Sequence, residues 1–207
     1  MPTHTLPRVP LALALLGALT FTACDSAEPV DGGAGEEELI TQVTLTLTPQ
    51  GGGTALTARA DFEADGTNPT FTPARLVLQP GVTYDGAIEL RDTANGEDIT
   101  EEVRAEAEEH LLQYGFASLG AGQITVTDRE SDYTSEDENG GDFAVGLTFR
   151  VAVSEGAGTA DLGQGTLLTA ILYHFDDAPK TSSTATSDEI DVEVAFPVSF
   201  ATAPTAR

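Results

Sequence analysis

The chain has 207 residues, of which 34 are Asp or Glu and 9 are Lys or Arg, so its formal net charge is −25 at pH 7. A surface this acidic repels phosphate, which argues against nucleic acid as a partner. The same charge opposes a compact state unless salt screens it, and we therefore expect a halophilic host. The length suits one domain with a substantial core.

The first 23 residues have the layout of a secretory signal peptide. Arg8 supplies a positive charge, and the apolar run from Pro10 to Thr22 ends in small residues. This run is too short for a comfortable membrane span of ~20 residues. Cys24 follows and is the only cysteine. Because it has no partner for an intramolecular disulfide, it is either a lipid attachment site or a free thiol.

The residues around Cys24 resemble the lipobox of bacterial lipoproteins. Thr22, Ala23 and Cys24 match that motif, and Phe21 stands where leucine is commoner. The resemblance implies that the Cys24 sulfur carries a lipid that anchors the exported chain in the cell envelope, with the outer membrane expected and the domain in the periplasm or at the cell surface. Residues 24–37 have almost nothing to bury and are expected to form a flexible tether.

Alternation of apolar and polar residues dominates the chain from 38 to 201, and it predicts β-strands. Strands are expected at about 38–48, 55–62, 75–79, 83–91, 112–117, 123–128, 143–153, 165–175 and 189–200. In the last of these the even-numbered residues are apolar from Ile190 onward, so Asp191 is expected to face solvent. About nine short strands separated by turns predict a mainly β fold, a single antiparallel, immunoglobulin-like β-sandwich. Residues 202–207 are expected to be a loose tail.

One segment, near 98–111, departs from this alternation and predicts a short helix. Asp98 and Glu101 have the spacing of a capping box. Val103, Ala107 and Leu111 then recur at helical spacing.

Two histidines suggest a metal site. Glu106 and His110 are four residues apart, one turn of the predicted helix, and His174 lies in the strand expected at 165–175. Carboxylate oxygen and imidazole nitrogen are ordinary zinc ligands, so Glu106, His110 and His174 form a candidate site for zinc or copper. The alternative is that His110 is a hydrogen-bonded core residue and that its pairing with Glu106 is only a surface contact.

Calcium is a weaker candidate. Asp61, Glu63 and Asp65 alternate before a glycine, like the opening of a calcium-binding loop, but Thr72 occupies the twelfth position, where a bidentate glutamate is needed. A solvated turn is the alternative. The acidic stretch 128–142 is likewise either a weak calcium site or a solvated loop.

Catalysis has little support in the sequence. There is no G-x-S-x-G motif, no thiol besides Cys24, and the single lysine, Lys180, is expected to be exposed. We therefore expect no enzymatic activity.

Three segments resemble a group of small acidic lipoproteins from bacteria with outer membranes. They are ELITQVTLTLTP (38–49), DITEEVRAEAEEH (98–110) and ILYHF (171–175). That group is identified as having a type 1 periplasmic binding fold, a name for two α/β lobes, whereas the strand pattern here predicts a sandwich. The resemblance implies a ligand- or metal-handling role beside an outer-membrane receptor, with Glu106, His110 and His174 at the matching positions.

These observations together predict a lipid-anchored binding module of the cell envelope that handles a metal or another ligand. Two alternatives stay open. One is a structural or adhesive envelope lipoprotein without activity, and the other is a hydrolase whose site has no motif in the sequence.

Overall fold

A computed structural model of the chain describes residues 38–63, 68–135, 140–158, 165–175 and 178–201. The expected signal peptide, Cys24 with its tether, and the tail at 202–207 lie outside these ranges. Within the ranges, no helix has the length and apolar character needed to cross a bilayer.

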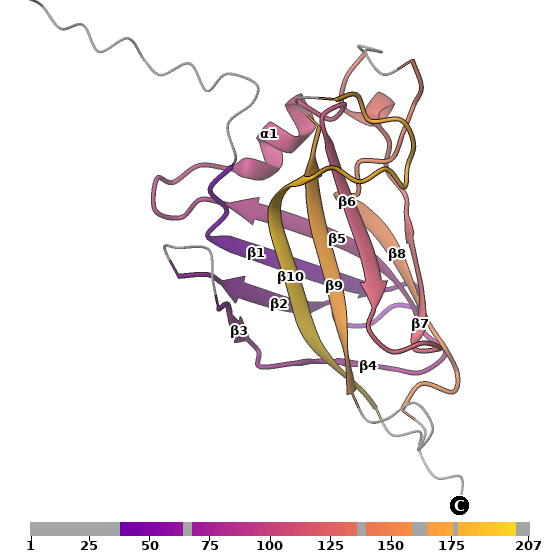
Figure 1. Cartoon of the computed structure of the whole chain (residues 1–207). Helices are drawn as coiled ribbons and strands as arrows, with labels where there is room; N and C mark the ends of the chain where they lie inside the picture. Colours follow the sequence, from indigo (N-terminus) through magenta and orange to yellow (C-terminus); the bar gives the residue numbers. More distant parts are fainter. Residues whose placement is uncertain (1–37, 64–67, 136–139, 159–164, 176–177, 202–207) are drawn as a thin grey trace, which may run out of the picture. The chain divides into compact units, whose positions relative to one another are not determined.

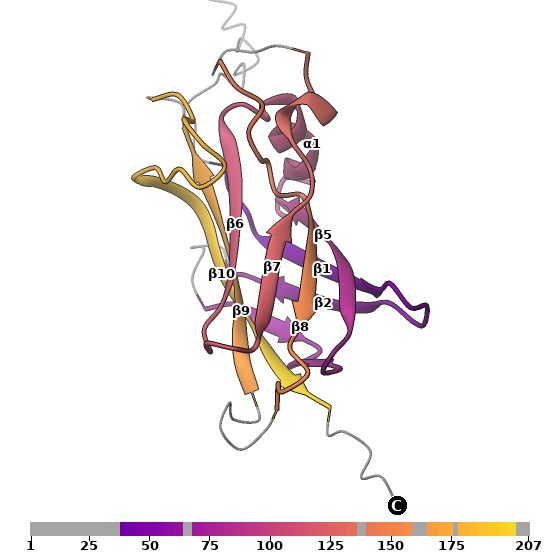
Figure 2. The ribbon, with the colours of Figure 1, turned by 90° about the vertical axis from the view of Figure 1, so that its right-hand side faces the viewer.

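The described residues form two β-sheets that pack face to face (Figures 1 and 2). The larger sheet has the strand order β3–β2–β1–β5–β8–β7 and the smaller has the order β4–β10–β9–β6. The strands are β1 (Gln42–Pro49), β2 (Leu56–Asp61), β3 (Thr70–Thr72), β4 (Leu76–Leu78), β5 (Thr83–Arg91), β6 (His110–Phe116), β7 (Gly122–Val126), β8 (Thr148–Val153), β9 (Gly165–His174) and β10 (Glu189–Phe200). One α-helix, α1 (Ile99–Ala105), and one 3₁₀ turn, η1 (Glu130–Asp132), accompany them.

This architecture confirms the predicted mainly β sandwich with one short helix. Each of the nine expected strands is present, and β3 is an addition that pairs with β2. Its three residues are too few to produce a recognisable alternation in the sequence. All strand pairs are antiparallel except β4 with β10, which run parallel.

Alternate apolar residues of both sheets fill the space between them. In β5, for example, every second residue from Tyr84 to Leu90 is buried. Gly86 belongs to this row but has no side chain, and the Phe149 ring fills the space where one would lie. A Cβ on Gly86 would lie 2.4 Å from a ring atom. The same ring stacks on Tyr114 of the opposite sheet with centroids 4.1 Å apart. Close packing of this kind holds the two sheets in register.

Helix α1 covers one end of the sandwich (Figure 2). The Thr100 hydroxyl accepts a hydrogen bond from the Leu90 N–H at 2.8 Å and donates one to the Leu90 carbonyl at 3.1 Å, which pins the helix to β5. The capping-box prediction is wrong, because Asp98 makes no side-chain cap and its carboxylate binds Arg91 instead.

The helix is also shorter than the predicted range of 98–111. It ends at Ala105, and His110 and Leu111 already belong to β6, where they pair with His174 and Tyr173 of β9. Strand pairing with a distant segment therefore overrides the local helical pattern.

Lys180 is fully buried, contrary to expectation. Its ammonium donates to the carbonyls of Ala107, His110 and Ala144 at 2.7, 2.8 and 3.1 Å and pairs with the Glu130 carboxylate at 2.8 Å. Burial lowers the pKa of Lys180, and the adjacent Glu130 opposes that shift. The side chain supplies donors to the carbonyls of the turn between α1 and β6, and so it supports the start of β6.

Two carboxylates of the acidic stretch 128–142, Asp128 and Glu130, are buried, whereas Asp132 and Asp142 are exposed. Asp128 is buried and accepts hydrogen bonds from the backbone N–H groups of Gly146 and Thr148 and from the Tyr133 hydroxyl. These bonds hold η1 and the approach to β8 together, so Asp128 is a structural residue and not part of a solvated loop.

Candidate metal site

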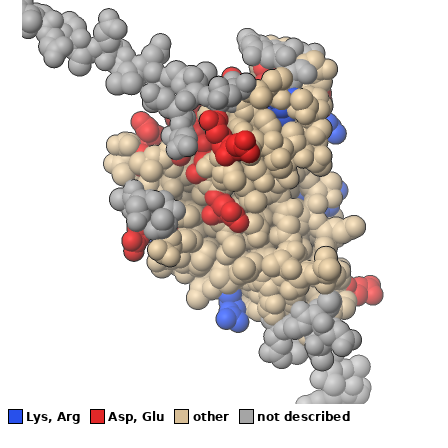
Figure 3. All heavy atoms as spheres, in the orientation of Figure 1, with Lys and Arg blue, Asp and Glu red and all other residues tan. Residues whose placement is uncertain are grey.

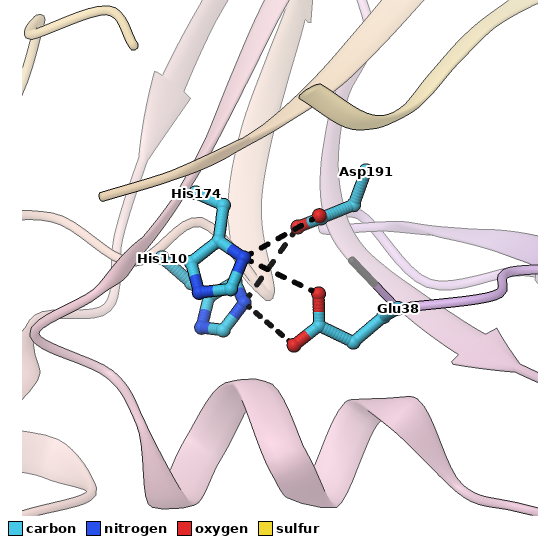
Figure 4. Close-up of side chains that lie close together, drawn as sticks. All are labelled: Glu38, His110, His174 and Asp191. Atoms are coloured by element: carbon cyan, nitrogen blue, oxygen red, sulfur yellow. Dashed lines mark ion pairs between the residues drawn. The ribbon is translucent and has the colours of Figure 1, made fainter. Parts of the chain in front are cut away.

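Four side chains converge at the end of the sandwich that α1 covers: Glu38, His110, His174 and Asp191 (Figure 4). One ligand atom from each lies within 4.8 Å of those of the others. All four side chains are shielded from solvent, with exposed fractions of 9% for Glu38, 0% for His110, 3% for His174 and 0% for Asp191.

Strand pairing brings the two histidines together. His110 is the first residue of β6 and His174 is the last of β9, and the two are direct cross-strand partners. Their imidazole rings stack with centroids 4.5 Å apart and an interplanar angle of 23°. Both rings turn a nitrogen toward the same two carboxylates (Figure 4).

A β-bulge places Asp191 in the site. Ile190 lies opposite Tyr173 and Val192 lies opposite Leu172, so Asp191 is an extra residue in β10. Its side chain is fully buried, whereas Ile190 is 44% exposed. The prediction that Asp191 faces solvent is therefore wrong, because strict alternation holds only where no residue is inserted into the ladder.

Glu38 reaches the site from the other sheet, because it precedes β1. The segment is fixed at Thr41, whose N–H donates to the Arg91 carbonyl at 3.0 Å and whose hydroxyl accepts from the Thr93 N–H at 2.7 Å. Ile40 is buried beside it. These contacts bring the Glu38 carboxylate over the histidines.

The backbone sets the orientation of His110. Its Nδ1 lies 3.1 Å from the Glu106 carbonyl oxygen, and a carbonyl only accepts, so Nδ1 carries a proton. In the neutral ring the lone pair is therefore on Nε2, which faces Glu38 Oε1 at 3.2 Å and Asp191 Oδ2 at 3.6 Å. This arrangement, in which the outer nitrogen is held by a carbonyl, is common for metal-binding histidines.

His174 completes a nearly symmetrical arrangement. Its Nδ1 lies 3.6 Å from Glu38 Oε2 and 3.6 Å from Asp191 Oδ1. Each carboxylate thus directs one oxygen toward each imidazole. On the far side of the ring, Nε2 lies 3.8 Å from Glu109 Oε2.

Several polar atoms of the site have no hydrogen-bond partner. Among the described residues, neither Asp191 oxygen nor His110 Nε2 makes a well-formed hydrogen bond. Leaving such groups buried and unpaired costs about 1–3 kcal/mol each, and more when they are charged. The four side chains alone therefore do not offset the cost of burying these atoms.

The two carboxyl groups differ in acidity. Burial acts to raise the pKa of Glu38, but His110, with help from Asp191 and His174, lowers it below its ordinary value. For Asp191, burial raises the pKa, His174 opposes the shift, and the neighbouring Glu38 charge adds to it, so the net direction is upward. Two adjacent buried carboxylates are stable together only with compensating positive charge.

Further carboxylates lie near the four-residue cluster. Acidic side chains gather over α1 and the first half of β10 (Figure 3). Burial raises the pKa of both Glu102 and Glu106, and nearby acidic groups that include Glu38 add to the rise. A surface of this kind concentrates cations near the four-residue cluster.

The structure thus brings together two of the three predicted zinc or copper ligands, His110 and His174. The Glu106 side chain is not one of the four, since the helix ends before His110 and only the Glu106 carbonyl contacts that ring. Sequence reasoning missed Glu38 and Asp191. Glu38 had no signal beyond its position before a strand, and the alternation around Asp191 pointed outward.

The predicted calcium ligands are not assembled in the same way. Asp61 accepts hydrogen bonds from Arg59 and Gln42, both at 2.8 Å, so its two oxygens are occupied. Glu63 is exposed, and Asp65 lies outside the described residues.

No protein-family model matches the chain, and no curated protein is significantly similar to it in sequence.

Proposed function

We propose that this protein is a metal-binding module that holds one transition-metal ion, with zinc the best fit, between Glu38, His110, His174 and Asp191. The observation that carries the proposal is the convergence of two imidazoles and two carboxylates in a buried site, where His110 Nε2 and both Asp191 oxygens lack hydrogen-bond partners. A divalent cation would balance the two negative charges and bind the lone pairs.

The separations support one ion shared by the four groups. Ligand atoms placed tetrahedrally at ~2 Å from zinc lie about 3.3 Å from one another. The four nitrogen-to-oxygen distances between the histidines and the carboxylates, counting both oxygens of each carboxylate, are 3.2, 3.6, 3.6 and 3.6 Å. One ligand atom from each of the four residues lies within 4.8 Å of the other three. Coordination of an ion would therefore draw the four ligand atoms closer together than they lie here.

The donor set favours zinc or copper over calcium. Calcium takes six to eight oxygen ligands, whereas two of the four groups here are imidazoles. Four protein ligands with little solvent exposure fit a site that stores or carries a metal better than one that activates water, since catalytic zinc keeps an open position. The lipobox motif at Cys24 supports a location at the cell envelope for such a binding module.

The test is calorimetric titration of the chain carrying Cys24→Ser, which removes a thiol that would itself bind zinc. We expect one Zn²⁺ per chain with micromolar or tighter affinity, a similar response to Cu²⁺, and none to Ca²⁺. His110→Ala and Asp191→Asn should each weaken Zn²⁺ binding by about 100-fold or more, because each removes a ligand.

Glu106→Gln is the matched control. It changes a carboxylate close to the site that is not one of the four, and binding should stay near that of the parent chain. Absence of Zn²⁺ and Cu²⁺ binding by the folded chain would contradict the proposal, as would equal losses in Asp191→Asn and Glu106→Gln.

A further inference from the structure

We propose that Glu38 is the gate of the site: the segment 38–41 closes over the metal and opens to release it, and the bound metal in turn fastens this segment to the sandwich. The inference rests on the proposed function and adds how metal exchange and the N-terminal segment are coupled.

The four ligands are unequal in how the fold holds them. His110, His174 and Asp191 belong to three adjacent strands, β6, β9 and β10, of one sheet. Strand pairing fixes the backbones of His110 and His174 whether or not a metal is present, and the paired neighbours Ile190 and Val192 hold Asp191 between them. Glu38 comes from outside that sheet and precedes the first strand of the other one.

The backbone at Glu38 is only weakly attached to the rest of the described domain. Within the described ranges, the first anchored residues are Ile40, which is buried, and Thr41, whose backbone bonds to Arg91 and Phe62. No backbone hydrogen bond of Glu38 or Leu39 to a described residue is present, and the Leu39 side chain is 46% exposed. The Glu38 carboxylate, 3.2 Å from His110 Nε2 and 3.6 Å from His174 Nδ1, supplies the side-chain contact at this end of the segment.

Movement of Glu38 would change the site in a defined way. With Glu38 withdrawn, three ligands would still hold the ion, but one coordination position would be open to a competing ligand. Glu38 is also the most exposed of the four side chains, at 9%, and so the least shielded from solvent. Because such coupling is reciprocal, an ion that binds Glu38 must also reduce the motion of the segment.

The first measurement is hydrogen exchange of the Cys24→Ser chain with and without Zn²⁺. Peptides that cover 38–44 should gain protection when Zn²⁺ binds, whereas peptides from β8, which contributes no ligand, should not change.

The second measurement is the rate at which a chelator removes bound Zn²⁺. Ile40→Ala keeps all four ligands but loosens the segment, and it should speed release about tenfold, a coupling of ordinary size. Ile88→Ala is the matched control, since Ile88 is equally buried in β5 but lies opposite Leu45 in β1, away from the site. Its release rate should equal that of the parent chain.

The outcomes separate the two proposals. The gate proposal is wrong if Zn²⁺ binds with the expected ligands but leaves hydrogen exchange at 38–44 unchanged. It is also wrong if Ile40→Ala and Ile88→Ala release Zn²⁺ at the same rate. In both cases the proposed metal site stands. If no Zn²⁺ binds to the folded chain, both fail.

Discussion

At the scale of single residues, Lys180 connects several segments of the fold that its sequence context does not relate. The ammonium joins the α1–β6 turn, the residue Ala144 before β8, and Glu130 of η1. A buried cation with one carboxylate and three carbonyl acceptors is a well-satisfied arrangement, but removing the lysine takes the cation away from all four acceptors at once. Lys180 also donates to the His110 carbonyl oxygen, so it helps to fix the backbone that positions this histidine.

We predict that Lys180→Met destabilises the metal-free domain by about 3–5 kcal/mol, because Glu130 is left as a buried, uncompensated charge. Urea unfolding followed by circular dichroism measures this. Adding Glu130→Gln to the same chain should recover part of the loss. Arg150→Ala, which removes an ion pair to the exposed Asp85, is the control and should have no measurable effect. Equal effects of Lys180→Met and Arg150→Ala would show that the buried pair is not structural.

At the scale of elements, the β-bulge in β10 decides the composition of the site. The inserted residue lets two consecutive side chains, Asp191 and Val192, both turn inward. Val192 continues the core, and Asp191 reaches the histidines. A regular strand with the same sequence would offer the site an isoleucine and would expose the carboxylate.

Deletion of Ile190 tests this role of the bulge. Without that residue the alternation continues unbroken, Asp191 lies opposite Tyr173, and its carboxylate turns to the outer face. We expect the domain to stay folded by circular dichroism while its Zn²⁺ affinity falls by about 100-fold or more, because a ligand is lost. Ile190→Ser keeps the residue count and should keep the affinity. A deletion variant that binds Zn²⁺ like the parent chain would show that the bulge is not needed.

At the scale of the whole molecule, charge is the dominant feature. A net charge of −25 on 207 residues creates self-repulsion that opposes the compact state. Few cations are present to offset it, and one of them, Lys180, is committed to the interior. Screening by salt therefore acts on the stability of the entire domain and on its attraction for metal ions alike.

We predict that the melting temperature of the metal-free chain rises between 0.1 and 2 M NaCl, where the screening length falls from about 10 Å to below 3 Å. Differential scanning calorimetry with a chelator present measures the change. Chloride is the suitable anion, since sulfate also stabilises proteins by exclusion from their surface. A melting temperature that stays flat or falls with NaCl would argue against adaptation to high salt.

Local pattern predicted most of the fold because alternation is a direct consequence of placing a strand between a core and solvent. Each expected strand, from Gln42–Pro49 to Glu189–Phe200, is present. The histidines were identified as candidates from their chemistry alone. The proposed partnership of His110 with Glu106 rested on a helix that the structure ends at Ala105, where pairing with β9 takes over.

The sequence by itself determined the secondary-structure class, the acidic character of the surface and the two imidazoles. These follow from residue type and from spacing over a few positions. Only the tertiary structure decided that His110 and His174 stack, that Asp191 turns inward, and that Glu38 joins them from the other sheet. The reason is physical: such contacts depend on strand pairing and on one inserted residue, and neither is encoded in the local periodicity that a sequence displays.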